Sequence, residues 1–336
     1  MRIALDAMGG DLAPQSTVRG ALEAVRENPT LEVVLIGNET AIREHLPGSV
    51  PSGIEIHHAA EVIAADDEPV KAVRRKKDSS LVVTVEMARS LQVDAAISAG
   101  NTGALMAAGL LITGRMKGIE RPALAALIPN LQGKVTLLLD VGANMDAKPL
   151  HLKQYAIMGS LYVEKVLGYE RPTVGLLNVG TEEAKGNELC KAAYTLLKQS
   201  GNIRFIGNIE ARELMCGPCD VLVCDGFVGN VALKALEGAA STILSLLKRE
   251  MTSNLLNKAA AAILKPSLSQ FKDRMDYAEY GGAPLLGLRR PVIKAHGSSD
   301  ERAIKNAVLV AAKFAAQDVN GWIEKELETE PQTESE

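Results

Sequence analysis

The chain of 336 residues has a formal net charge of -4, a hydrophobic fraction of 47% and an aromatic fraction of only 3%. This composition can bury a large core, as one α/β unit or two lobes. Because it offers neither a basic field nor aromatic stacking platforms, nucleic acid is not an expected partner.

The beginning of the chain, "MRIALDAMGGD", does not resemble a signal peptide, because Asp6 interrupts the apolar run. No apolar run reaches the roughly 18 residues that span a bilayer. We therefore expect a cytoplasmic protein whose membrane contact, if any, is peripheral.

Short apolar, β-rich runs alternate with amphipathic segments of helical length. In chain order, strands are expected at 2–7, 31–37, 54–59, 95–100, 134–142, 173–180, 203–207 and 220–226. The alternation indicates a mostly parallel sheet with helices on both faces, and the lack of period-two polarity indicates strands buried on both sides. We expect one α/β domain over residues 1–328, with a disordered acidic tail at 329–336.

Polar, glycine-rich loops end five strands: "DAMGGD", "SAGNTGA", "DVGANMDAKP", "NVGTEEAKGNE" and "DGFVGNVALK". "KAHGSSD" would be a sixth. Ordinary turn and cap residues explain any one of them. Together they predict one polar rim at the carboxyl edge of the sheet, where α/β proteins bind ligands. The rim suits an oxyanion or phosphate rather than a metal, because it supplies small donors and a few cations: Asn101, Thr102, Asn144, Asn178, Thr181, Asn230, Lys148, Lys185, Lys234 and Lys294.

The stretch "VIKAHGSSDERAI" has two interpretations. Ser298 or Ser299 caps a helix that has Glu301 in its first turn. Alternatively, the Gly-Ser-Ser entry to the helix binds an anion, which would also explain Lys294 and His296.

Motifs for common cofactors and for hydrolases are missing. The sequence has no G-x-G-x-x-G after a strand, no G-x-x-x-x-G-K-[ST], no G-x-S-x-G and no H-E-x-x-H. "CGPC" at 216–219 follows a helix-like segment and precedes a strand-like one, the reverse of a redox dithiol, so we interpret it as a turn. A zinc site formed by Cys216, Cys219 and Cys224 lacks a fourth ligand nearby. We expect no cofactor and no metal.

Two segments do not fit the sheet pattern. Residues 241–276 predict a helical hairpin outside the sheet, and an apolar stripe with flanking lysines lies on it: Leu255, Leu256, Lys258, Ile263 and Lys265. Core or dimer packing is the commoner explanation for such a stripe. A helix that lies at a membrane surface is the more specific functional alternative. The basic run Arg74, Arg75, Lys76 and Lys77 is either a solvated face balanced by Asp66, Asp67 and Glu68 or a docking patch for an acidic protein.

In order and spacing, six blocks resemble the bacterial phosphate acyltransferases of the PlsX type: "RIALDAMGGD", "SAGNTGALM", "LLLDVGAN", "GLLNVGTEEAKGNE", "DGFVGNVALKALEG" and "PVIKAHGSSD". The resemblance runs from Met1 to about residue 320. It implies a three-layer α/β/α fold similar to phosphotransacetylases and isocitrate dehydrogenases. The implied reaction converts acyl-[acyl carrier protein] and inorganic phosphate to acyl phosphate and free carrier protein. A dimer is implied too, bound peripherally at the inner face of the cell membrane and feeding phospholipid synthesis through a membrane glycerol-phosphate acyltransferase.

Phosphate is already an anionic nucleophile, so this chemistry requires an anion cradle and donors to the thioester carbonyl rather than a covalent intermediate. As catalytic residues we expect His296, Asn230 and Asp225. Expected substrate-binding residues are Gly9, Gly10, Asn101, Thr102, Gly103, Asn144, Asn178, Gly180, Thr181, Lys185, Lys234, Lys294, Gly297, Ser298 and Ser299. The carrier protein would dock on residues 74–77. Two alternatives stay open: a non-catalytic sensor of acyl carrier protein or phosphate, and a dehydrogenase of related fold.

Overall fold

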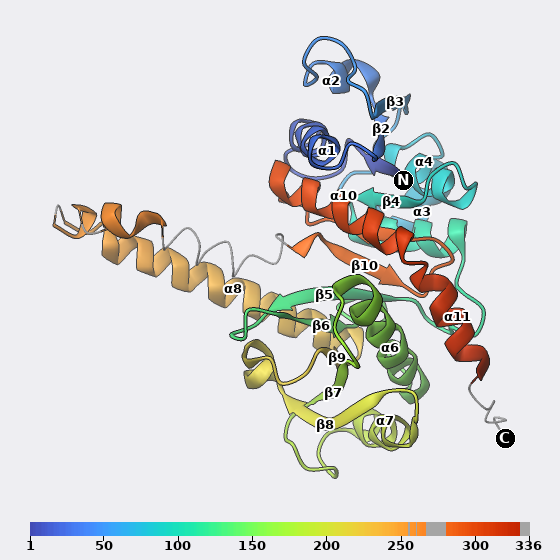
Figure 1. Ribbon diagram of the computed structural model, residues 1–336, viewed down its shortest axis with the longest axis vertical. Coiled ribbons are helices and arrows are strands. Elements are labelled where there is room, and N and C mark those ends of the chain that lie inside the picture. The colour runs from blue at the N-terminus through green and yellow to red at the C-terminus, as the bar shows by residue number, and fades with distance from the viewer. Residues whose placement is uncertain (255, 260, 267–279, 330–336) are drawn as a thin grey trace.

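The computed structural model describes residues 1–254, 256–259, 261–266 and 280–329 (Figure 1). One eleven-stranded sheet forms its centre, in the order β3-β2-β1-β4-β11-β10-β5-β6-β9-β7-β8. The strands are β1 (Arg2–Asp6), β2 (Glu32–Gly37), β3 (Ile54–His58), β4 (Ala95–Ser98), β5 (Ala123–Pro129), β6 (Val135–Leu139), β7 (Thr173–Asn178), β8 (Arg204–Glu210), β9 (Val221–Val223), β10 (Ala283–Leu286) and β11 (Val292–Lys294).

Helices cover both faces of this sheet. Those packed on one face, with the π-helical turn η2, are α1 (Gln15–Glu27), α6 (Pro149–Tyr162), η2 (Val163–Leu167), α7 (Glu188–Gln199), α10 (Glu301–Ala316) and α11 (Val319–Thr329). The other face carries α3 (Pro69–Arg75), α4 (Ser80–Arg89), α5 (Thr102–Ala108), the π-helical turn η1 (Gly109–Thr113), the 3-10 helix η3 (Ala211–Cys216) and the beginning of α8 (Gly226–Met251). The short α2 (Glu39–Arg43) follows β2.

Successive strand residues enter opposite apolar layers. On β1, Ile3 and Leu5 belong to the core beneath α1 and α10, whereas Ala4 belongs to the core on the other face. All three side chains are fully buried. Burial on both faces explains why the strands read as unbroken apolar runs, and it confirms the predicted three-layer arrangement with a mostly parallel sheet.

Two strands that the sequence pattern did not predict, β5 and β10, join the two halves of the sheet. β10 pairs antiparallel with both β11 and β5, and β5 pairs antiparallel with β6. As a result β6, β9 and β7 run opposite to β1, β4 and β11. The prediction that six loops share one edge is therefore wrong: the loops after β1, β4 and β11 form one group, and those after β6, β9 and β7 leave the sheet in the opposite direction.

Helix α8 projects far from the sheet (Figure 1). It begins directly after β9, well before the hairpin predicted at 241–276. Residues 256–259 and 261–266 are helical and follow its far end. We call α8 from residue 241 together with residues 256–259 and 261–266 the helical arm. Leu255, Ala260 and residues 267–276 of the predicted hairpin lie outside the described residues, as do residues 330–336 of the predicted tail.

Candidate active site

A cavity of about 270 Å³ lies on the sheet face that carries α5 and α8. It sits above β5 and β10, where the two halves of the sheet meet. Its polar lining comes from both halves, namely Thr102, Asn230, Lys234, Glu237, Lys294 and His296. Apolar residues make up the rest of its wall, among them Leu124, Ala126, Leu127, Val141, Leu233 and Ala283.

His296 is held by its own loop. Its Nδ1 lies 2.8 Å from Ser298 Oγ and accepts a hydrogen bond from the Ser298 backbone N–H at 3.3 Å. An Nδ1 that accepts leaves the proton of the neutral ring on Nε2. Burial lowers the pKa of His296, with Glu237 opposing this and Lys294 and Lys234 adding to it. His296 is therefore neutral at pH 7, which suits a hydrogen-bond donor better than a proton donor.

Lys294 is the buried cation of the cavity, with 8% of its surface exposed. Its Nζ donates to the Ala99 carbonyl at 3.2 Å and to the Ala295 carbonyl. Burial lowers the pKa of Lys294 to about 8, against the opposing charge of Asp6 and Asp11. Because an ammonium has three donors, two carbonyls leave one for an anion.

Helix α8 brings Asn230 and Lys234 to the cavity. Gly142, which has a φ of +131°, lies next to Asn230, since a Cβ there would be in van der Waals contact with its amide nitrogen at 3.5 Å. Lys234 forms an ion pair with Glu237 at 2.8 Å. Asp225, predicted to be catalytic, instead caps α8 by accepting from the Val228 N–H at 3.0 Å, and it lies outside this cavity.

Glycines let the loops after β1, β4 and β11 pack closely. A Cβ on Gly9 would lie 2.6 Å from the Gly100 backbone nitrogen, and Gly10 has a φ of +105°. The Asp11 N–H donates to the Gly297 carbonyl at 2.8 Å. The predicted glycines thus shape the loops beside the cavity. Ser299 is buried, and the N-cap of α10 is Asp300 rather than either serine, because its Oδ1 accepts from the Ala303 N–H at 2.9 Å.

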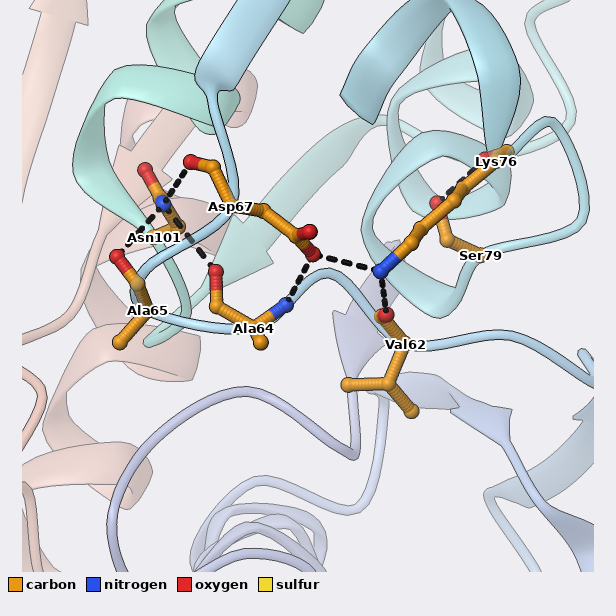
Figure 2. A network of polar contacts seen from close by, with 7 residues as sticks. All are labelled: Val62, Ala64, Ala65, Asp67, Lys76, Ser79 and Asn101. Carbon is orange, nitrogen blue, oxygen red and sulfur yellow. Dashed lines mark hydrogen bonds and ion pairs between the residues drawn. The ribbon is translucent and has the colours of Figure 1, made fainter. Parts of the chain in front are cut away.

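Both polar atoms of the Asn101 side chain form hydrogen bonds within the protein. Its side-chain oxygen caps α5 by accepting from the Ala104 N–H at 3.0 Å. Figure 2 shows its amide nitrogen directed at the carbonyls of Ala64, Ala65 and Asp67, with donor–acceptor distances of 3.0 to 3.3 Å. A Cβ on the neighbouring Gly103 would lie 2.7 Å from a side-chain carbon of Pro69. Of the residues predicted in this loop, only Thr102 lines the cavity.

The Asn144 side chain also forms hydrogen bonds within the protein. Its amide nitrogen donates to the Pro122 carbonyl at 2.7 Å, to the Tyr155 hydroxyl at 3.0 Å and to Asp140 at 3.1 Å. The Asp140 carboxylate also accepts from the backbone N–H groups of Leu124, Gly142, Ala143 and Asn144. The pair holds the loop beside Asn230.

The loop after β7 lies apart from this cavity. Asn178 donates to the Lys185 carbonyl at 3.1 Å and accepts from the Val179 N–H. Gly180 is buried, Thr181 is exposed, and Lys185 lies 4.0 Å from Glu182. Asn178 and Asp225 line a separate, mainly apolar cavity of about 510 Å³. The structure therefore does not bring these predicted substrate-binding residues to His296.

The sequence reasoning missed Asp6 and Asp140, both completely or almost completely buried. Each follows a buried apolar strand and precedes a glycine-containing turn, "LDAMGG" and "LDVGAN". A carboxylate that ends such a strand needs donors or a cation beside it. That pattern could have identified both.

The basic run divides into two kinds of residue. Figure 2 shows Lys76 Nζ between the Asp67 carboxylate at 2.5 Å and the Val62 carbonyl at 3.0 Å. Arg74, Arg75 and Lys77 are exposed. Lys76 fixes the loop before α3, which leaves the other three cations available to a partner.

The cysteine motif forms a turn, as interpreted from the sequence. Gly217, with a φ of +75°, ends η3. Cys216 is exposed, and burial raises the pKa of Cys219 to about 12. A thiol with that pKa is a poor nucleophile at neutral pH. Among the described residues, no three His, Cys, Asp or Glu side chains are grouped as a metal site requires.

On the helical arm, Leu256 and Ile263 are each 81% exposed. Lys258 and Lys265 are exposed beside them. In the part of the chain that the structure covers, no helix has the length and apolar character needed to cross a bilayer.

The fold is that of phosphotransacetylases. A phosphotransacetylase from Streptococcus pyogenes matches with a TM-score of 0.63 at 16% identity, covering 95% of this chain and 94% of its own. A branched-chain phosphotransacylase from Enterococcus faecalis V583 matches with a TM-score of 0.54 at 15% identity, over 93% and 99% of the two chains.

Residues 1–321 match the family described as "Fatty acid synthesis protein", and the chain belongs to this family. The phosphate acyltransferase of Brevibacillus brevis is 70% identical over 336 residues, the whole of both chains. That of Geobacillus thermodenitrificans is 57% identical over 328 residues, covering 98% of this chain and 99% of its own.

Proposed function

We propose that the protein is a phosphate acyltransferase that converts acyl-[acyl carrier protein] and inorganic phosphate to acyl phosphate and free carrier protein. The observation that carries the proposal is the divided lining of the cavity. Cations and amide or hydroxyl donors occupy one part, and Leu124, Ala126 and Leu233 occupy another. An acyl thioester attacked by phosphate needs both environments at one carbon atom. The names of the relatives support the same reaction.

In the proposed reaction, a phosphate oxygen bonds to the acyl carbon and the carbon–sulfur bond breaks. The electron pair goes to sulfur, and the carrier thiolate, with an intrinsic pKa of roughly 8.5, takes its proton from solvent. Lys294 and Lys234 bind the phosphate. His296 Nε2–H and the Asn230 amide donate to the carbonyl oxygen as it gains charge, each contributing about 3–4 kcal/mol. The step uses no cofactor and no covalent enzyme intermediate.

The test is to replace the two donors. His296→Ala and Asn230→Ala should each lower kcat by at least about tenfold, because each removes a donor to the developing oxyanion. Acyl phosphate production is measured directly, with melting temperature as the check on folding. His57→Ala, on the exposed edge strand β3, is the matched control and should retain activity. Normal turnover in both donor variants would remove them from the site, and native protein that makes no acyl phosphate would favour a sensor.

The proposal extends to partners and location. Acyl carrier proteins are acidic, so Arg74, Arg75 and Lys77 suit their docking. The exposed apolar side chains of the helical arm, flanked by Lys258 and Lys265, suit an anionic membrane surface. We expect a homodimer in the cytoplasm, associated peripherally with the inner face of the membrane. Release there would shorten the path of the labile acyl phosphate to a membrane glycerol-phosphate acyltransferase.

A further inference from the structure

Three polar residues form a row across adjacent strands beside the cavity. β4 lies between β1 and β11 in the sheet. Lys294 is the register partner of Ser98, and Leu5 is the partner of Ile97, so the next step along the strands places Asp6 opposite Ser98. Register partners on parallel strands point to the same face. Carboxylate, hydroxyl and ammonium therefore lie side by side on the face that carries the cavity.

Asp6 is bound tightly within this row. It is 1% exposed, and Ser98 Oγ donates to its Oδ2 at 2.6 Å. The Met8 N–H donates to Oδ1 at 3.2 Å, and the Ser80 hydroxyl contributes from the beginning of α4. Burial raises the pKa of Asp6, and the hydrogen bonds from Ser80, Ser98 and Met8 oppose that rise. A nearby positive charge is therefore needed to favour the ionised carboxylate.

Lys294 supplies that counter-charge from the other side of β4. Its Nζ donates to the carbonyl of Ala99. Ser98, the last residue of β4, thus contacts the carboxylate, and the residue after it contacts the ammonium. The charged groups that act on Lys294 are Asp6 at the end of β1, Asp11 in the next loop and Lys234 on α8. Lys294 in turn helps to lower the pKa of His296, which follows β11. Of the two acidic groups, only Asp6 is buried.

We propose that Asp6 is a positioning residue for the phosphate site, whose buried negative charge favours the protonated form of Lys294, the buried cation that lines the cavity. This inference rests on the proposed function, because it makes Lys294 the phosphate ligand. It also explains how a lysine buried to this extent can carry a charge at neutral pH.

The first experiment is a pH profile of Asp6→Asn. Without the carboxylate, Lys294 loses its proton at lower pH. The alkaline fall in kcat/KM for phosphate should therefore move to lower pH, with a loss of at least about fivefold at pH 8 that shrinks toward pH 6. Titration calorimetry with inorganic phosphate should show the same shift in affinity. Val33→Ala, in the fully buried core of β2, is a control for destabilisation without loss of charge. A profile parallel to the native one would overturn the inference.

A double-mutant cycle tests the pairing without using activity. Asp6→Asn and Lys294→Met should each lower the urea midpoint, and the double variant should lose less than the sum, because neither charge is then buried alone. Additive losses would overturn the inference. If the native protein forms no acyl phosphate, the proposed function fails, whereas the cycle still reports on the pair.

Discussion

Replacing Leu256 and Ile263 with glutamate tests the proposed membrane contact of the helical arm. Both side chains are 81% exposed, so nearly all their apolar surface is available to a bilayer. Full burial of such a side chain contributes roughly 1.5–3 kcal/mol, and a basic residue near anionic lipid about 1 kcal/mol. Two apolar and two basic residues therefore supply about 5–8 kcal/mol. At 1.4 kcal/mol per factor of ten, this gives reversible binding rather than permanent anchorage.

The assay is sedimentation with liposomes containing anionic phospholipid. The double variant loses the apolar contribution and gains repulsion, so its partitioning should fall at least about 100-fold. Acyltransferase activity in solution and the molecular mass of the native protein should not change. Leu131→Glu with Leu91→Glu replaces two exposed apolar residues outside the helical arm and should leave liposome binding intact. If the arm variant still sediments with liposomes, or its molecular mass in solution falls, the stripe is a packing surface.

Two further predictions follow from the contacts described. Arg74→Glu with Arg75→Glu should raise the KM for acyl carrier protein several-fold in low salt with little change for phosphate, since charge steering weakens as ionic strength rises; equal rises for both substrates would instead indicate a folding defect. Asn144→Ala should lower the free energy of unfolding by about 2–3 kcal/mol in urea denaturation, because it leaves buried partners without their donor. Its KM for phosphate should stay native, and a selective rise in that KM would restore Asn144 as a ligand.

Much of the fold is local in origin and was predictable. Unbroken apolar runs such as "VVLI" in β2 identify buried strands, and the amphipathic segments between them identify the covering helices. The prediction failed at β5 and β10. "ALAALIP" and "APLL" resemble any short apolar stretch. Nothing in their own residues indicates that they pair antiparallel with distant strands.

The site, like the fold, was predictable only in part. Lys294, His296, Asn230, Lys234 and Thr102 were predicted from strand ends, and the structure gathers them around one cavity. Asn101, Asn144 and Asn178 also lie in polar loops that follow strands, but their amide nitrogens donate to backbone carbonyls. An asparagine that caps a helix or closes a loop cannot be distinguished by residue type from one that faces a ligand, because both use the same amide.

The sequence by itself determined most of the strands, the class of chemistry and the family, since these depend on residue types and on their spacing along the chain. Only the tertiary structure decided which polar groups form hydrogen bonds within the protein and which face the cavity. It also placed Asp6 and Lys294 in one row across β4, although 288 positions separate them in the chain. The reason is physical: the charge state of a buried group depends on neighbours a few ångströms away, and in a sheet joined by crossovers those neighbours come from remote parts of the chain.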